Sequence, residues 1–242
     1  GCTDAGSTTV IVNPTSAVTS TVSTGIICRG STVNLTSSGG SSTATLLTES
    51  FDGITNAWTR TNTSTGGTPA AAAWALRPDS YNPGNLIQSN NNTQFYLSDS
   101  YNQNGTTTAT TLTSPVMNST GYTSLTLNFF HYFRFAGVAG EAARVEVSTN
   151  GTGWTVLATY TSNQGSSTVF ANPSINMNAY INEPTLYIRF RYNSNARARY
   201  WAIDNVTISG NTTPSYSWTS SPSGQITPAQ AALQNPTGVA PT

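Results

Sequence analysis

Hydrophobic and polar positions alternate with a period of two along much of the middle of the chain, as they do in half-buried β-strands. In residues 187–192 large or aromatic side chains alternate with arginine, and residues 201–208 repeat the alternation. Residues 125–135 alternate at first and are then aromatic on both faces, which predicts a central strand covered on both sides. No long window has a helical period. The pattern therefore predicts an all-β protein.

Turn residues separate these segments at regular spacing. Residues 143–157 form two alternating segments joined by Asn150-Gly151, a dipeptide that tolerates positive φ and favours a hairpin turn. Twenty glycines, twelve prolines and 10% aromatic residues, in a chain rich in Thr, Ser and Asn, favour the same class. Many short strands with frequent turns predict a β-sandwich.

The charge balance argues against binding to nucleic acid, and the lack of a long apolar stretch argues against membrane insertion. Only 7% of the 242 residues are charged, all nine cations are arginine, and the net charge is zero. Binding to nucleic acid needs a basic surface that releases counterions, so we do not expect it. No stretch approaches the roughly 20 apolar residues of a membrane helix, and the first residues lack the basic and apolar segments of a signal peptide. We expect no membrane insertion, and a mature fragment or repeat unit cut from a longer protein.

Composition divides the chain into three zones. Residues 1–45 are rich in Thr, Ser and Val, and residues 46–210 carry nearly all the aromatic, arginine and acidic residues. From residue 211 onward Pro and Ser return. The middle zone is therefore expected to hold the main folded core.

The outer zones resemble the immunoglobulin-like modules that occur in tandem on Bacteroidota surface proteins. The resemblance rests on CRGSTVNLTSS, YSWTSSPSG and QNPTGVAPT, and GCTDAGSTTVIVNP is similar to the end of such a module. It implies that residues 1–14 are the last strand of one module, residues 15–45 the first strands of the next, and residues 211–242 its continuation. A strand without sheet partners exposes unpaired N–H and C=O groups. We therefore expect neighbouring copies to join end to end in a filament.

Residues 46–210 resemble the jelly-roll domain of the MAM-like and cleaved-adhesin type, which is common in secreted Bacteroidota proteins. Six segments carry the resemblance in the expected order: TESFDG, FYLSDSY, TLTSPVM, LTLNFFHYFRF, ARVEVSTNGTGWTVL and LYIRFRY with YWAIDNVTI. Together the two resemblances imply an all-β fold, a jelly-roll β-sandwich with flanking immunoglobulin-like strands. Domains of this type serve as adhesion modules, carbohydrate binders and spacers.

The two cysteines, Cys2 and Cys28, fit one disulfide formed in an oxidising compartment. Their spacing suits neither a redox CxxC motif nor a zinc site. Two buried free thiols are the alternative. If the chain is out of phase with its module, Cys28 is expected to pair with Cys2 of the next copy.

We do not expect an enzyme. His131 is the only histidine, and its place in an aromatic strand favours a buried, hydrogen-bonded core residue over a catalytic base. Glu141, Glu146 and Glu183 lack the aromatic cleft of paired glycosidase carboxylates. Glu146 lies between two valines, so it is expected to face solvent or to pair with an arginine. No GxSxG, P-loop or dinucleotide-binding motif is present.

Calcium is the candidate cofactor, with a structural role. This cation takes six to eight oxygen ligands from carboxylates, amides and backbone carbonyls. The family resemblance implies a site near the first and last strands of the jelly roll, which are neighbours, and the candidate ligands are Glu49, Asp52, Asp99 and Asp204. The alternative is that Asp52 caps an Asp-Gly turn and that Asp204 accepts backbone or arginine hydrogen bonds.

Arg197 and Arg199, together with Tyr200 and Trp201, are candidates for a sugar-binding face. Aromatic rings stack on sugar rings, and guanidinium groups donate hydrogen bonds to hydroxyls. The alternative is a pair of solvated arginines before a core strand. From these features we expect an extracellular adhesin or surface-filament repeat unit at the cell surface, in contact with neighbouring copies and surface glycans. A carbohydrate-binding module of a secreted enzyme is the alternative.

Overall fold

The computed structural model of the chain describes residues 7–11, 19–23, 30–38, 40, 42–53, 56–214, 216–221 and 223–240. It divides the chain into two compact units, one of residues 45–210 and one of residues 1–44 with 211–242. The boundaries expected from composition were at residues 46 and 210.

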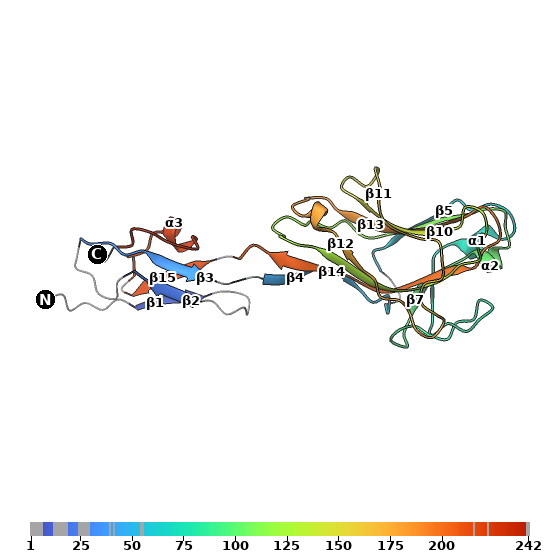
Figure 1. Ribbon diagram of the computed structural model, residues 1–242, viewed down its shortest axis with the longest axis horizontal. Helices are drawn as coiled ribbons and strands as arrows, with labels where there is room; N and C mark the ends of the chain where they lie inside the picture. Colours follow the sequence, from blue (N-terminus) through green and yellow to red (C-terminus); the bar gives the residue numbers. More distant parts are fainter. Residues whose placement is uncertain are drawn as a thin grey trace. The chain divides into compact units, whose positions relative to one another are not determined.

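The unit of residues 45–210 is built from two antiparallel β-sheets (Figure 1). The first sheet has five strands, in the order β11 (Thr155–Tyr160), β10 (Ala142–Ser148), β13 (Tyr187–Ser194), β8 (Thr108–Thr113) and β5 (Thr59–Asn62). The second has six: β12 (Ser174–Asn176), β9 (Thr126–Arg134), β14 (Tyr200–Thr212), β7 (Phe95–Asp99) and β6 (Ala75–Arg77) in order, with β4 (Ser42–Glu49) also paired with β14. Three short helices complete it: α1 (Pro69–Ala72), α2 (Ser100–Gln103) and η1 (Asn178–Tyr180).

The chain passes back and forth between the two sheets, as in a jelly roll. Strands β7, β9, β12 and β14 belong to one sheet, and the intervening β8, β10, β11 and β13 belong to the other. The all-β jelly-roll sandwich expected from the sequence is confirmed. Residues 195–199 connect β13 in one sheet to β14 in the other.

Aromatic rings fill the space between the sheets. The Phe190 ring from β13 lies 5.0 Å from the Phe129 ring and 5.7 Å from the Trp201 ring, measured between centroids, and both contacts are edge-to-face. This is the geometry that aromatic pairs prefer. Strand β9 lies between β12 and β14, and His131, Tyr132 and Phe133 are buried although they face alternate sides. The prediction of a strand covered on both sides is confirmed.

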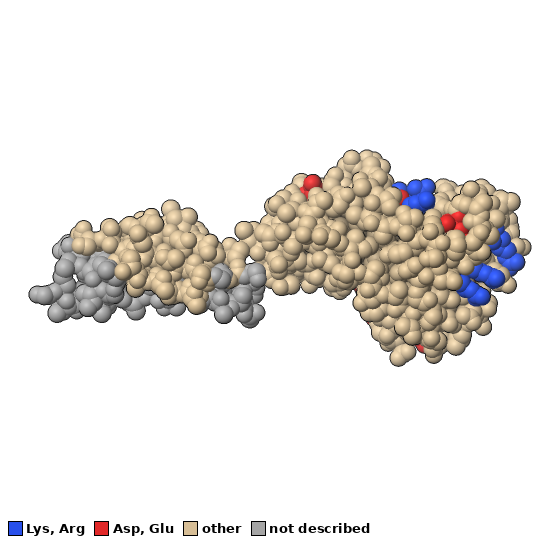
Figure 2. All heavy atoms as spheres, viewed as in Figure 1, with Lys and Arg blue, Asp and Glu red and all other residues tan. Residues whose placement is uncertain are grey.

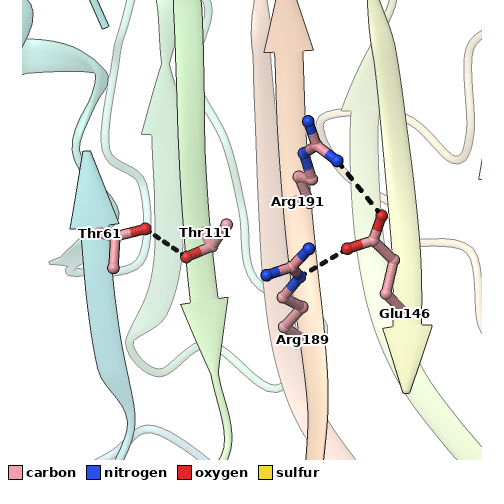
Figure 3. Close-up of polar contacts among 5 residues, drawn as sticks. All are labelled: Thr61, Thr111, Glu146, Arg189 and Arg191. Atoms are coloured by element: carbon pink, nitrogen blue, oxygen red, sulfur yellow. Dashed lines mark hydrogen bonds and ion pairs between the residues drawn. The ribbon is translucent and has the colours of Figure 1, made fainter. Parts of the chain in front are cut away.

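Charged side chains are sparse on the surface (Figure 2), and the outer face of the five-stranded sheet holds the ion pairs of the described residues (Figure 3). Glu146 Oε2 lies 2.5 Å from Arg189 Nε, and Glu146 Oε1 lies 3.6 Å from Arg191 Nη1. The expected pairing of Glu146 with an arginine is confirmed. On neighbouring strands of the same face, the Thr61 and Thr111 hydroxyls are hydrogen-bonded at 2.5 Å.

The second unit contains two antiparallel strand pairs. Strand β1 (Ser7–Ile11) pairs with β15 (Ser217–Ser221), and β2 (Thr19–Val22) pairs with β3 (Leu35–Ser38). Val33, Leu35, Trp218 and Val239 form a small buried cluster, and α3 (Pro228–Ala231) begins with a capping box at Thr227.

One expectation about the ends of the chain is wrong. The N-terminal strand was expected to lack a partner in its own chain, but β1 pairs with β15 of the same chain over five residue pairs. Near the C-terminus, Val239 forms an isolated antiparallel bridge with Val33, with backbone hydrogen bonds of 2.8 and 3.0 Å. The argument for end-to-end joining from unpaired ends therefore fails. Cys2 and Cys28 lie outside the described residues, and no described helix is long and apolar enough to cross a membrane.

Candidate functional site

Tyr200 and Trp201 do not form a sugar-binding face. Their side chains are 1% and 0% exposed, because β14 lies between β9 and β7 and is covered on both sides. Tyr200 packs in a buried aromatic cluster with Tyr132. Trp201 lies between the sheets, where its Nε1 donates a hydrogen bond to His131 Nδ1 at 3.1 Å. The prediction is therefore wrong for the two rings.

Arg197 and Arg199 both stack on the ring of Tyr101, which belongs to α2. The guanidinium carbons lie 3.9 and 4.9 Å from the ring centroid. Arg197 Nε also donates to the Tyr101 carbonyl at 3.0 Å, and Tyr101 N–H donates to the Arg199 carbonyl at 3.1 Å. These contacts hold the connection between β13 and β14 against α2. Cation–π contacts at exposed sites contribute roughly 0.5–1 kcal/mol each, so the tyrosine positions two cations without a carboxylate.

A third arginine completes the cluster. Arg134 ends β9 and lies opposite Tyr200 in the β9–β14 ladder. Its Nη1 donates to the Tyr200 hydroxyl at 3.2 Å, and this hydrogen bond raises the pKa of Arg134. Arg134 and Arg199 open onto a hollow of about 460 Å³, here called the arginine hollow. Its lining is Tyr132, Arg134, Phe135, Ala136, Asn163, Gly165, Ser166 and Arg199.

The loop of residues 161–171 forms one wall of the arginine hollow and is fastened to β9. Backbone hydrogen bonds of 2.8–3.0 Å join His131 to Ala171 and Phe133 to Gln164 in both directions. Asn163 Oδ1 accepts a further bond of 2.8 Å from the Phe135 N–H. The wall is therefore held by regular backbone pairing as well as by side chains.

No acidic side chain lines the hollow. The acid that follows the Phe135–Ala136 wall in sequence, Glu141, is turned inward and is 4% exposed. Its Oε2 accepts hydrogen bonds of 2.9 Å from the Ala136 and Gly137 N–H groups, and its Oε1 accepts one of 3.2 Å from the Tyr192 hydroxyl. Among the described residues, carboxylate ion pairs involve Arg189 and Arg191 and not Arg134, Arg197 or Arg199. Figure 2 shows arginine groups gathered at one end of this unit.

Sequence reasoning identified Arg197 and Arg199 but missed Arg134 and the 161–171 loop. Arg134 ends the aromatic strand, and only the antiparallel register brings it opposite Tyr200. Neither its spacing nor its neighbours in sequence distinguish it from the arginines of the outer sheet face.

The four candidate calcium ligands do not form one cluster. Asp99 of β7 lies opposite Tyr200 of β14. Tyr200 and Asp204 are four residues apart on β14, which corresponds to about 13 Å along the strand. Asp99 Oδ1 accepts from the Asn102 N–H at 3.0 Å, so it caps α2. Burial raises the pKa of Asp99, and its hydrogen bonds with Asn102 oppose that shift. In the part of the chain that the structure describes, no three acidic, histidine or cysteine side chains gather closely enough to hold a metal.

Asp204 and Asp52 are brought together. Asp204 is fully buried, its Oδ1 accepts from the Asn205 N–H at 2.8 Å, and its Oδ2 has no hydrogen-bond partner. Burial raises the pKa of Asp204 to about 8, and the nearby Asp52 carboxylate adds to the rise. Glu49, at the end of β4 beside β14, accepts a bond of 2.8 Å from the Phe51 N–H.

The backbone is strained beside both acids. Phe51 precedes Asp52 with φ of 58°, and Asn205 follows Asp204 with φ of 45°. Asparagine adopts positive φ more readily than most residues, whereas positive φ is a genuine outlier for a bulky residue such as phenylalanine, and such strain persists only where the surrounding structure holds it. The strained residues belong to the two segments that carry the two carboxylates.

His131 is a core residue, as expected. It is fully buried, its Nδ1 accepts from Trp201, and burial lowers its pKa to about 3. The rings of Phe129, Tyr160 and Trp201 surround it. The described contacts of its imidazole ring are with aromatic side chains, and the residue is not exposed to solvent.

No protein-family model and no curated protein matches the sequence. Several solved structures resemble part of it. The K1 cleaved adhesin domain of Lys-gingipain from Porphyromonas gingivalis W83 is 19% identical, with a TM-score of 0.49, and the match covers 69% of this chain and 97% of that domain. The K3 cleaved adhesin domain of the same protein is 17% identical, also with a TM-score of 0.49, and the match covers 69% of this chain and 99% of that domain. The TmCBM61 module, solved with β-1,4-galactotriose, is 14% identical with a TM-score of 0.41 over 63% of this chain and 87% of its own.

Structural neighbours of the cleaved-adhesin kind thus exist for part of the chain, whereas the MAM-like and tandem-module resemblances stay predictions. At these identities and TM-scores the similarity does not indicate a function. A functional hypothesis therefore rests on the residues of the arginine hollow.

Proposed function

We propose that residues 45–210 form an extracellular, non-catalytic adhesive module that binds surface glycans through the arginine hollow. The observation that carries this proposal is a cluster of three arginines, Arg134, Arg197 and Arg199, that have no carboxylate partner among the described residues. Two of them, Arg134 and Arg199, line a hollow of about 460 Å³. Pockets of roughly 300–1,000 Å³ with a few placed polar groups are typical of small-ligand sites. A carbohydrate-binding module of a secreted enzyme would use the same residues, and the domains adjoining it in the parent protein distinguish the two.

The chemistry of the hollow suits sugars. A guanidinium group presents planar pairs of N–H donors that bind two oxygens at once. The Phe135 ring, half-buried at the wall, offers an apolar surface beside these donors. Arg134 ends the paired strand β9, Phe135 donates its N–H to Asn163, and Arg199 is held by Tyr101, so little ordering is required on binding.

The test is a glycan array probed with the full chain, followed by titration calorimetry on any glycan retained. The variant carrying Arg134→Gln and Arg199→Gln is expected to lose at least about tenfold in affinity, as when charged hydrogen-bonding partners are removed. Arg191→Gln is the matched control, because Arg191 is an exposed arginine on the outer face of the five-stranded sheet. Unchanged binding by the double variant would place the ligand site elsewhere.

We also propose that Asp204 and Asp52 contribute to a structural calcium site. The residues fit, because Asp204 Oδ2 is a buried oxygen without a partner and a second carboxylate lies nearby. Calcium prefers oxygen ligands, and a cation there would supply the positive charge that a buried carboxylate lacks. Two carboxylates provide only part of a set of six to eight ligands, so backbone carbonyls and water would complete it.

The calcium proposal is tested by thermal melting of the full chain with calcium and with chelator. Ligand at about a hundred times its Kd stabilises by about 2.7 kcal/mol, which in a chain of this size raises Tm by roughly 5–10 °C. Asp204→Asn keeps the size of the side chain and is expected to abolish the difference. A wild-type melting curve indifferent to both calcium and chelator would disprove the site.

A further inference from the structure

We infer that the ligand of the arginine hollow is an acidic glycan, one whose sugar carries a carboxylate or a sulfate group. The inference rests on the proposed glycan-binding function and names the class of ligand. Its basis is the juxtaposition of three guanidinium groups around Tyr101 and Tyr200, beside a hollow that no acid lines.

The first step is the uneven distribution of charge. The sequence has nine cations and nine acids in 242 residues, so charged side chains are scarce and balanced overall. Arg189 and Arg191 share Glu146 on the outer sheet face. Arg134, Arg197 and Arg199 have no such partner among the described residues. These three arginines gather around Tyr101 and Tyr200, and no described carboxylate forms an ion pair with them there.

The second step is how these cations are held. The centroid of the Tyr101 ring lies 3.9 Å from the guanidinium carbon of Arg197 and 4.9 Å from that of Arg199. Arg134 is bonded through Nη1 to the Tyr200 hydroxyl. Tyrosine contacts fix the arginines in place while leaving their net positive charge intact. Like charges held close repel one another, and a bound anion relieves that repulsion.

The acid that follows the Phe135–Ala136 wall in sequence does not supply this counter-charge. Glu141 follows the Phe135–Ala136 wall, yet both of its oxygens accept hydrogen bonds from Ala136, Gly137 and Tyr192. Its side chain is 4% exposed. The fold thus turns this carboxylate inward, and the charged side chains that line the hollow are the two arginines Arg134 and Arg199. Planar guanidinium groups match the geometry of carboxylate and sulfate oxygens.

The experiment compares the full chain's affinity for probes that share a sugar backbone. Oligogalacturonate supplies the carboxylate, its fully methyl-esterified form is the neutral match, and a sulfated galactan with its unsulfated parent supplies the second pair. We expect an anionic member to bind at least about tenfold more tightly than its neutral match, and raising NaCl from about 50 to about 500 mM to weaken only the anionic one. The pair that shows the larger ratio identifies carboxylate or sulfate as the recognised group.

Variants separate the site from general attraction. Arg134→Gln, Arg197→Gln and Arg199→Gln are each expected to weaken anionic binding about three- to tenfold, whereas Arg191→Gln is expected to leave it unchanged. Each variant is checked for an unaltered Tm. Equal affinity for acidic and neutral probes, still dependent on Arg134, would overturn the acidic preference and leave glycan binding standing. Absence of binding to glycans of any kind would overturn the proposed function itself. Equal binding of inorganic polyphosphate would overturn the inference in favour of a general polyanion surface.

Discussion

The imidazole of His131 is held in one protonation state by its neighbours. Its Nδ1 accepts a hydrogen bond from Trp201 Nε1, so the neutral ring carries its proton on Nε2. A second proton would remove that acceptor and place a charge among the rings of Phe129, Tyr160 and Trp201. Burial accordingly lowers the pKa of His131 to about 3. Burial raises the pKa of the Tyr160 hydroxyl, whose ring lies 4.7 Å from the His131 ring between centroids.

We predict an acid-sensitive contribution of His131 to stability. The unfolded chain takes up a proton on this residue below about pH 6.5, whereas the folded chain does so only near pH 3, so stability is lost as the pH falls between these values. From pH 7.5 to pH 4 the loss from this residue is about 3 kcal/mol. His131→Gln keeps an acceptor for Trp201 but does not titrate. Urea unfolding at both pH values measures the difference, and an equal pH dependence in wild type and variant would contradict the assignment.

The fate of single side chains was partly readable from the sequence. The two-sided aromatic pattern around His131 correctly indicated a buried residue. The same kind of pattern at Tyr200 and Trp201 was misread as a ligand face, because alternation shows that one side of a strand is covered but not whether the other is. Burial of both sides follows from the place of β14 between β9 and β7.

At the scale of elements, the arginine hollow depends on one loop turn. Gly165 lies in the wall formed by residues 161–171 and has φ of 65°. A Cβ at this position would lie 2.6 Å from Ala171 N and 2.8 Å from Val169 O, both backbone atoms. Gly151, in the turn between β10 and β11, has φ of 75°, but a Cβ there would make only an ordinary contact of 3.4 Å with the Tyr187 ring. The two glycines differ in backbone crowding rather than in handedness.

We predict that Gly165→Ala weakens ligand binding and Gly151→Ala does not. Each substitution bears the left-handed strain of roughly 1–2 kcal/mol, which lowers Tm by several degrees. Only Gly165→Ala also forces the loop away from β9, so it is expected to lower Tm further and to reduce glycan affinity. Calorimetry and binding measured on the two variants in parallel test this. Equal losses of binding would show that the loop does not shape the site.

The strands themselves were predictable, but their register was not. Alternation located β9, β13 and β14 and the hairpin of β10 and β11, because it follows directly from burial of one strand face. The pairing of Arg134 with Tyr200, which builds the site, depends on the antiparallel register between β9 and β14. Register also decides which proposed calcium ligands meet. The first and last strands of the jelly roll were expected to be neighbours, and Asp52 does lie near Asp204. Asp99 lies in a different part of the ladder, opposite Tyr200.

At the scale of the whole molecule, two units have separate cores and different strand pairings. The sandwich is filled by aromatic rings between its sheets, whereas the second unit has its own cluster of Val33, Leu35, Trp218 and Val239. Composition indicated the division, because aromatic residues concentrate between residues 46 and 210. It could not show which strands pair near the ends, since Thr- and Ser-rich strands specify register weakly. The pairing of β1 with β15 was missed for this reason.

The separate cores predict that the sandwich folds without the second unit. Residues 42–212 retain the whole of β4 and β14, the two strands in which the boundaries between the units fall. We expect this fragment to give one cooperative melting transition and the near-ultraviolet circular dichroism of packed aromatic rings, with the glycan affinity of the full chain. A shorter fragment of residues 50–199 is the control. It lacks β14, which supplies the buried Trp201 and Ile203 and pairs with β9, β7 and β4, so it is expected to remain unfolded. If residues 42–212 also fail to show packed aromatic rings, the sandwich needs the second unit for its stability, and the two cores do not fold independently.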